Sequence, residues 1–278
     1  MTEGMPGPPM DEPSAAERSA IGMFDSGFGG LTVARAVIDL LPHRDLVYVG
    51  DTGRYPYGPR PLDEVRRFAN QITRFLVDEH GVGAVIVACN TASAAALESL
   101  QASADVPVVG VIEPGVRALV RATEAGRVGV IGTVGTIASG AYQRAIAAND
   151  AAVELTCAAC PGFVEFVERG EARSEQVHVL AERLLAPVVN AKVDALLLGC
   201  THYPYLARTI TDVMGRDVVL VSSADETAFE LRAALGDAAA DPSGRRQFLS
   251  SGDVELFRRL GRELFGPELT AVEHTPWD

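Results

Sequence analysis

Short apolar runs alternate with longer amphipathic segments from Ala20 onward. Between these runs, segments such as 62–79 and 174–190 repeat apolar residues every three or four positions, which is the helical period. Continuous Val, Ile and Leu runs that alternate with helices are typical of parallel strands buried on both faces. The pattern therefore predicts an α/β fold. The apolar runs are "AIGMFD", "DLVYVG", "AVIVAC", "PVVGVI", "RVGVIG", "VELTCAAC", "ALLLGC" and "DVVLVS".

The same order of elements occurs twice along the chain. The stretches "IGMFDSGFGGLTVARAV" and "VGVIGTVGTIASGAYQRAI" each predict a strand, a Gly-rich turn and a helix. An apolar strand that ends in cysteine follows each turn, with Cys89 lying 64 residues after Asp25 and Cys200 lying 68 residues after Gly132. We therefore expect two pseudosymmetric doubly wound parallel-sheet domains that face a central cleft. Ligands bind beyond the carboxyl ends of such strands, so both cysteines should point into this cleft from opposite sides.

The predicted boundaries divide the chain into a tail and two α/β domains. Residues 20–112 and 222–272 form the first domain, and residues 113–221 form the second. Residues 1–19 are rich in Pro, Gly and acidic side chains without periodicity, so they cannot bury enough apolar surface to offset the entropy of ordering. We expect them to form a disordered N-terminal tail.

Composition excludes several classes of function. The net charge of −13 would repel a phosphate backbone, so nucleic acid is not expected as a primary partner. No apolar run approaches the roughly 18 residues that span a bilayer. The first twenty residues also lack the basic segment followed by an apolar segment that is typical of a secretory leader. We therefore expect a cytoplasmic protein without a membrane partner. Four cysteines in a reducing compartment are expected to be free thiols, metal ligands or catalytic groups.

Cys89 and Cys200 admit a structural and a functional interpretation. Cysteine is among the most buried residue types, so either one can be a core residue. Hydroxyl, amide and imidazole groups follow each cysteine, and these are poor core residues but good helix caps and hydrogen-bonding groups. A thiol in the first turn of a helix should also have a pKa below the usual value of about 8.5. The flanking residues are Asn90, Thr91 and Ser93 after the first cysteine, and Thr201 and His202 after the second.

Two loops at strand ends are candidates for binding a ligand. "FDSGFGGLT" matches neither standard nucleotide-binding fingerprint, but Asp25, Ser26 and the bare amides at a helix start suit a small zwitterion. The alternative is a tight turn with a capping aspartate. In "GDTGRYPYGPR", Tyr57 and Gly58 are placed to close over a small substrate, although the loop can equally be a plain turn.

A zinc site is the main alternative from another class. Cys157 and Cys160 have the C-x-x-C spacing and could be joined by Cys200 and His202. However, one residue between Cys200 and His202 is too short for the usual spacing of a zinc-ligand pair. A zinc site of these four residues would also leave Cys89 without a role. Glu168 and Glu171 farther along are most simply solvated charges at a helix end, although either could reach the cleft.

Five motifs occur together and in order, namely "DSGFGG", "GDTGRYPYG", "ACNTAS", "CPGFVEFVERGE" and "GCTHYPYL". This set resembles the cofactor-independent glutamate racemases of the aspartate/glutamate racemase superfamily, over residues 20–235. The resemblance implies two α/β domains around the substrate, with Cys89 and Cys200 as the acid/base pair. It also implies that Asp25 and His202 assist the thiols and that Glu168 is a further acid near the site. The implied substrate contacts are Asp25, Ser26, Tyr57, Gly58, Asn90, Thr91, Thr201 and His202.

The resemblance further implies a cytoplasmic bacterial homodimer that needs no metal or cofactor and supplies D-glutamate for peptidoglycan synthesis. The chemistry agrees with these residue types, because inverting a stereocentre without a cofactor requires a base on one face of the substrate and an acid on the other. The motifs contain no lysine for a pyridoxal phosphate Schiff base, and no nucleotide loop for hydride transfer.

Two other functions remain open from the sequence. One is a racemase for aspartate or another acidic amino acid, because one methylene group of specificity is worth only about 1–3 kcal/mol. The other is a binding protein that has kept the cleft and lost catalysis. Such a protein would be expected to lack one thiol, whereas this chain has both.

Overall fold

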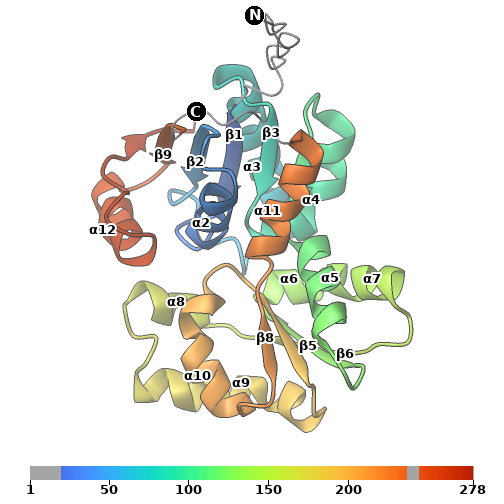
Figure 1. Ribbon diagram of the computed structural model, residues 1–278. Helices are drawn as coiled ribbons and strands as arrows, with labels where there is room; N and C mark the ends of the chain where they lie inside the picture. The colour runs from blue at the N-terminus through green and yellow to red at the C-terminus, as the bar shows by residue number, and fades with distance from the viewer. Residues whose placement is uncertain (1–19, 237–243, 278) are drawn as a thin grey trace, which may run out of the picture.

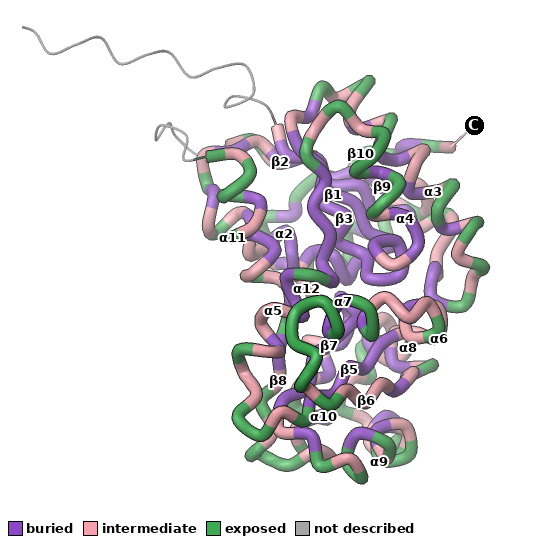
Figure 2. The backbone as a smooth tube through the Cα atoms, turned by 90° about the vertical axis from the view of Figure 1, so that its right-hand side faces the viewer, coloured by how far each residue is buried: buried purple, intermediate pink, exposed green. Residues whose placement is uncertain are grey.

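The computed structural model describes residues 20–236 and 244–277. The described residues form two parallel β-sheets, each flanked by helices, which make the upper and lower lobes in Figure 1. Strands lie at the centre of each lobe, and exposed residues are concentrated in the peripheral helices and turns (Figure 2). The tail predicted for residues 1–19 lies outside the described residues.

The upper sheet is built from strands at both ends of the described chain. Within the described residues its order is β10-β9-β2-β1-β3-β4, and all neighbouring strands are parallel. The sequence pattern did not predict β9 or β10, whereas the first four apolar runs correspond to β1 to β4. The strands are β1 (Ile21–Asp25), β2 (Leu46–Gly50), β3 (Ala84–Val87), β4 (Val108–Gly110), β9 (Arg246–Ser250) and β10 (Glu273–His274).

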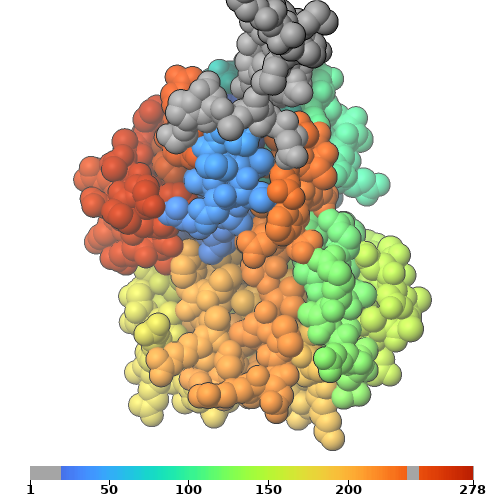
Figure 3. All heavy atoms as spheres, viewed as in Figure 1, coloured from blue at the N-terminus to red at the C-terminus, as the bar shows by residue number. Residues whose placement is uncertain are grey.

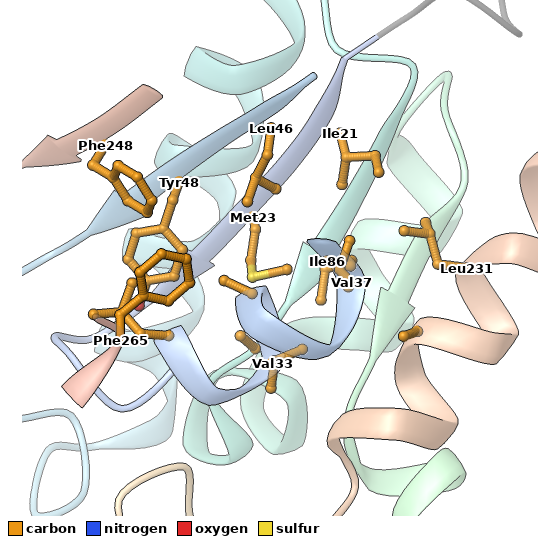
Figure 4. Close-up of a cluster of buried hydrophobic side chains, with 14 of the residues drawn as sticks. Ile21, Met23, Val33, Val37, Leu46, Tyr48, Ile86, Leu231, Phe248 and Phe265 are labelled. Carbon is orange, nitrogen blue, oxygen red and sulfur yellow. The ribbon is translucent and has the colours of Figure 1, made fainter. Parts of the chain in front are cut away.

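Alternate side chains of these strands enter two separate hydrophobic clusters. In β2, Leu46 and Tyr48 pack on one face of the sheet, and Val47 and Val49 pack on the other. Figure 4 shows the first cluster, in which Val33 and Val37 face the strands. The helices on that face are α2 (Leu31–Leu40), α11 (Ala224–Leu235) and α12 (Val254–Leu264). Those on the opposite face are α3 (Leu62–Arg74), which continues as the π-helix η1 (Phe75–Glu79), and α4 (Asn90–Ser103).

The lower sheet has the order β6-β5-β7-β8 within the described residues, again with parallel neighbours. Its strands correspond to the last four apolar runs of the sequence. They are β5 (Arg127–Gly132), β6 (Glu154–Ala159), β7 (Ala195–Gly199) and β8 (Val219–Val221). The helices of this lobe are α5 (Ile112–Ala122), α6 (Val134–Ala138), α7 (Ala141–Asn149), α8 (Phe163–Glu168), α9 (Glu175–Asn190), the 3₁₀ helix η2 (Tyr203–Leu206) and α10 (Ala207–Met214).

Helix α11 returns the chain to the upper lobe after β8, and it packs on α2 and on α5. The surface view shows α2 between α12 and α11 on this face (Figure 3). We propose that the two sheets are the cores of the two predicted domains, 20–112 with 222–272, and 113–221. None of the helices in the described ranges is both long and apolar enough to cross a membrane.

The two sheets present the carboxyl ends of their strands to each other. Asp25 ends β1 and pairs in register with Gly50, the last residue of β2. Cys89 lies two residues after the end of β3, and Cys200 directly follows β7. Because the carboxyl ends of parallel strands form the binding edge of doubly wound sheets, this arrangement collects the chemically active side chains at one place.

Candidate active site

A cavity of about 100 Å³ lies between the lobes. The upper lobe contributes residues that follow β1, β2 and β3, and the lower lobe contributes residues that follow β5, β6 and β7. Nine of the predicted site residues line it: Ser26, Tyr57, Gly58, Cys89, Asn90, Thr91, Cys200, Thr201 and His202. The predicted residues Asp25 and Glu168 do not line the cavity, but each contacts a residue that does.

Cys89 caps the start of α4 and is only 5% exposed. Its S–H group donates a hydrogen bond to Ser26 Oγ at 3.9 Å. Burial and the negative charge of Asp25 raise the pKa of the Cys89 thiol to about 12, although hydrogen bonds with the backbone of Ala92 and with Ser26 oppose the shift. The predicted lowering of this pKa by the helix start is therefore wrong, because burial outweighs the local amide dipoles.

His202 is buried beside the second thiol. Its Nε2 atom lies 3.1 Å from Glu168 Oε1, and the imidazole also forms a hydrogen bond with Cys200. Burial alone would lower the pKa of His202, but the hydrogen bonds to Cys200 and Glu168 and the charge of Asp25 raise it to about 10. His202 therefore keeps its proton at neutral pH and gives this wall of the cavity a positive charge.

Asp25 lies behind the cavity at the end of β1 and is fully buried. It accepts hydrogen bonds from the Gly27 backbone N–H at 3.0 Å and from Thr201 Oγ1 at 3.3 Å. Burial raises the pKa of Asp25, whereas His202 and these hydrogen bonds lower it, and the net direction is upward. The contact with Thr201 crosses from the upper to the lower lobe, so Asp25 acts on both walls.

Polar contacts hold the two walls together around the cavity. The hydroxyl groups of Thr91, Thr133 and Thr136 lie within 3.0 Å of one another across the two lobes. The Tyr142 hydroxyl donates to Asn90 Oδ1 at 2.6 Å. This contact commits the amide oxygen of Asn90 as an acceptor, so its amide nitrogen can donate to a ligand.

Tyr55, Gly29 and Thr133 belong to the site but were not predicted. Tyr55 and Thr133 line the cavity. The ring centroids of Tyr55 and His202 lie 6.5 Å apart. A Cβ atom at Gly29 would collide with Thr201 Oγ1 and His202 Nδ1, so this position needs glycine. The Gly-rich motif "FDSGFGGLT" could have indicated Gly29. The strand of the second repeat, β5, is followed directly by a hydroxyl residue, and this position could have indicated Thr133.

The zinc alternative does not fit this geometry. Cys160 lines the cavity and packs in the cluster around Tyr203, whereas Cys157 packs in a different hydrophobic cluster, around Tyr142. Over residues 20–236 and 244–277, no group of three or more His, Cys, Asp or Glu side chains is arranged to hold a metal ion.

The fold and the site define a class of α/β proteins in which two parallel sheets enclose a cavity with a thiol on each wall. The sequence model of the Asp/Glu/Hydantoin racemase family matches residues 31–230. The chain therefore belongs to this family, and the protein is a racemase, an isomerase.

The similar proteins within this family include several glutamate racemases. The glutamate racemase of Parafrankia sp. (strain EAN1pec) is 52% identical over 262 residues, which cover 92% of this chain and 94% of that protein. A glutamate racemase isoform of Bacillus anthracis matches with a TM-score of 0.88 and 39% identity, over 94% of this chain and 98% of that one. The Francisella tularensis glutamate racemase, solved with D-glutamate, matches with a TM-score of 0.84 and 31% identity over the same shares. The predicted family resemblance and α/β fold are confirmed.

Proposed function

We propose that this protein interconverts L- and D-glutamate by proton transfer between two thiols, without a cofactor. One observation carries the proposal: Cys89 and Cys200 line the same cavity from opposite lobes. An acid and a base on opposite faces of one carbon atom are what inversion requires. The similar proteins named above, which are glutamate racemases, support glutamate as the substrate.

In the L-to-D direction, the Cys200 thiolate removes the α-proton from L-glutamate, and the Cys89 thiol delivers a proton to the opposite face. The raised pKa of Cys89 favours the protonated thiol with which this direction begins, and the reverse direction begins after that thiol has given up its proton. Protonated His202 supplies positive charge beside Cys200, and Glu168 holds the imidazole in place. In the reverse direction Cys89 is the base and Cys200 is the acid.

The α-proton of an amino acid is very weakly acidic, so the developing carbanion must be stabilised by hydrogen bonds to the substrate carboxylate. The amide nitrogen of Asn90 and the hydroxyl groups of Thr91 and Thr201 are available donors on the cavity wall. The substrate ammonium group would lie toward Ser26 and the charge of Asp25. Each of these groups comes from a strand end, where the backbone fixes its place.

The direct test is to incubate the purified protein with L-glutamate in deuterium oxide, with no added cofactor. We expect the α-proton signal to disappear and the optical rotation to decay to zero, since enantiomers have an equilibrium constant of one. EDTA and hydroxylamine should leave the rate unchanged. A large loss with EDTA that zinc restores would contradict the cofactor-independent mechanism.

Aspartate tests whether the protein is specific for glutamate. Under the same conditions we expect it to react far more slowly than glutamate. Comparable turnover of aspartate would overturn the glutamate assignment while leaving the two-thiol mechanism standing, because the thiols act on the α-carbon that both substrates share.

The same proposal covers the role of the product. D-Glutamate made by this protein would supply peptidoglycan synthesis in the bacterial cytoplasm, and the protein would act as a homodimer without metal. These statements rest on the resemblance of the five sequence motifs to the cofactor-independent glutamate racemases.

A further inference from the structure

Asp51 is a buried carboxylate that the reaction described above does not use. Its Oδ2 atom accepts hydrogen bonds from Arg54 Nε at 2.7 Å and from the Tyr57 hydroxyl. Its Oδ1 atom accepts from Ser251 Oγ at 2.6 Å and from Trp277 Nε1 at 2.5 Å. Two donors from its own loop and two from distant parts of the chain therefore fix both oxygen atoms of Asp51, which is 0% exposed.

Trp277 is held in this position by its own contacts. Its indole packs edge-on against Phe75, with ring centroids 5.4 Å apart, and the Arg54 guanidinium lies 4.7 Å from the indole centroid. The backbone N–H of Thr275 donates to Ser250 O at 2.9 Å, which fixes the segment beside β9. The segment 275–277 is thus a strap, tied to the upper sheet at one end and to Asp51 at the other.

On its other side, Asp51 contacts a residue of the cavity wall. Tyr57 lines the cavity, while its hydroxyl is buried against Asp51. The next residue, Gly58, also lines the cavity, and its carbonyl oxygen accepts from the Gly135 backbone N–H of the lower lobe at 2.9 Å. A displacement of the Asp51 carboxylate would therefore move the loop that closes over the substrate.

We propose that Asp51 is a positioning residue for substrate binding and that the indole N–H of Trp277 sets its orientation. This inference rests on the proposed glutamate racemase activity. Neither side chain lines the cavity. Both act through Tyr57, whereas the two thiols are held by the ends of β3 and β7.

Trp277→Phe is the sharpest test, because phenylalanine keeps an aromatic ring against Phe75 and Arg54 but removes the N–H donor. We expect the KM for glutamate to rise about tenfold, as for a lost hydrogen bond to a charged group, with kcat changed less than about twofold. Glu273→Gln is the matched control, since it lies two residues before the strap at an exposed side chain that contacts Gln247, and it should leave both constants unchanged.

A double variant tests the route through Tyr57. Tyr57→Phe removes the hydroxyl that Asp51 holds, so adding Trp277→Phe to it should raise KM much less than Trp277→Phe does alone. An unchanged KM in Trp277→Phe, or effects that simply multiply in the double variant, would overturn the proposal.

An optical measurement separates this inference from the proposed activity. Trp277 is the single tryptophan of the chain, so its fluorescence reports on the strap without any turnover. We expect Asp51→Asn to shift the emission maximum, because it removes the charge beside the indole, and Glu273→Gln to leave it unchanged. An unshifted emission maximum in Asp51→Asn would contradict the contact between Trp277 and Asp51 on which the inference rests. Absent racemisation in the unmodified protein would instead contradict the proposed function.

Discussion

The Glu168 carboxylate and the His202 imidazole meet at 3.1 Å behind the cavity, although the two residues are 34 positions apart in the chain. Glu168 ends α8 and does not line the cavity, whereas His202 lines it beside Cys200. The charge of Glu168 therefore reaches the second thiol through His202. Because the hydrogen bond to Glu168 helps to raise the pKa of His202, a substitution at Glu168 should change the pH at which His202 loses its proton.

The stability of the protein should depend on the protonation of His202. Its pKa is raised from 6.5 to about 10 in the folded state, so its contribution to the free energy of unfolding is fully present below about pH 6.5 and is lost as the pH rises through about 10. In Glu168→Gln the pKa of His202 should fall, and this loss should begin at lower pH. Urea unfolding measured across this pH range tests the expectation.

The matched control for that experiment is Glu182→Gln. Glu182 lies 3.7 Å from His178 in an exposed pair of the same kind, so its removal should leave the pH profile of stability unchanged. Identical profiles for Glu168→Gln and the unmodified protein would contradict the coupling between Glu168 and His202.

Asp25→Asn should change the reactivity of Cys89. Removing the buried charge should lower the pKa of Cys89 from about 12, although burial, which is the larger cause, remains. Alkylation of Cys89 by iodoacetamide, followed by peptide mass spectrometry, should therefore proceed at lower pH in the variant. The racemisation rate should fall roughly 100-fold, because Asp25 also orients Thr201 and a small misplacement of a substrate-positioning group can cost that much. An unshifted alkylation profile would show that the Asp25 charge does not act on Cys89.

Gly29→Ala should impair catalysis more than stability. The new methyl group would displace Thr201 and His202 from their places, and a misplacement of about 1 Å costs roughly 100-fold in kcat/KM. Gly126→Ala is the control: it lies at the opposite end of β5 from the cavity, and no atom lies within 4 Å of the added Cβ, but its φ of +70° strains alanine, so this variant should lose stability and keep its kcat/KM. Equal kcat/KM values for the two variants would contradict the close packing assigned to Gly29.

The sequence pattern predicted the parts of the fold that depend on local periodicity. Eight apolar runs correspond to β1 to β8, and the segment 174–190 corresponds to α9, in which the Ser174 side chain accepts a hydrogen bond from the Val177 N–H as a helix cap. Strand β9, with the sequence "RQFLS", was missed because polar residues begin it and its partner β2 lies some 200 residues earlier. Pairing between distant segments leaves no local signal.

The motifs similarly located the cavity residues but not their electrostatics. Cys89 lies where the pattern predicted, yet its pKa is raised because burial and Asp25 act from outside its own motif. Asp51 was overlooked for the same reason, since its partners Ser251 and Trp277 join it only in the folded chain. Chemistry that depends on burial or on distant partners requires the three-dimensional structure.

The two-thiol mechanism is tested most directly by single cysteine variants. Removing either thiol should stop racemisation, because inversion needs an acid on the far face, so Cys89→Ala and Cys200→Ala should both lose several orders of magnitude in rate. The surviving thiolate can still exchange the proton on its own face.

Racemisation and α-deuterium exchange should therefore be measured together for both variants in deuterium oxide, starting separately from L- and D-glutamate. The two-base mechanism predicts lost racemisation in both variants, with any remaining exchange favouring L-glutamate in Cys89→Ala and D-glutamate in Cys200→Ala. Near-normal racemisation by either folded variant would contradict the two-base mechanism, and exchange with the opposite preference would show that the thiols serve the opposite faces.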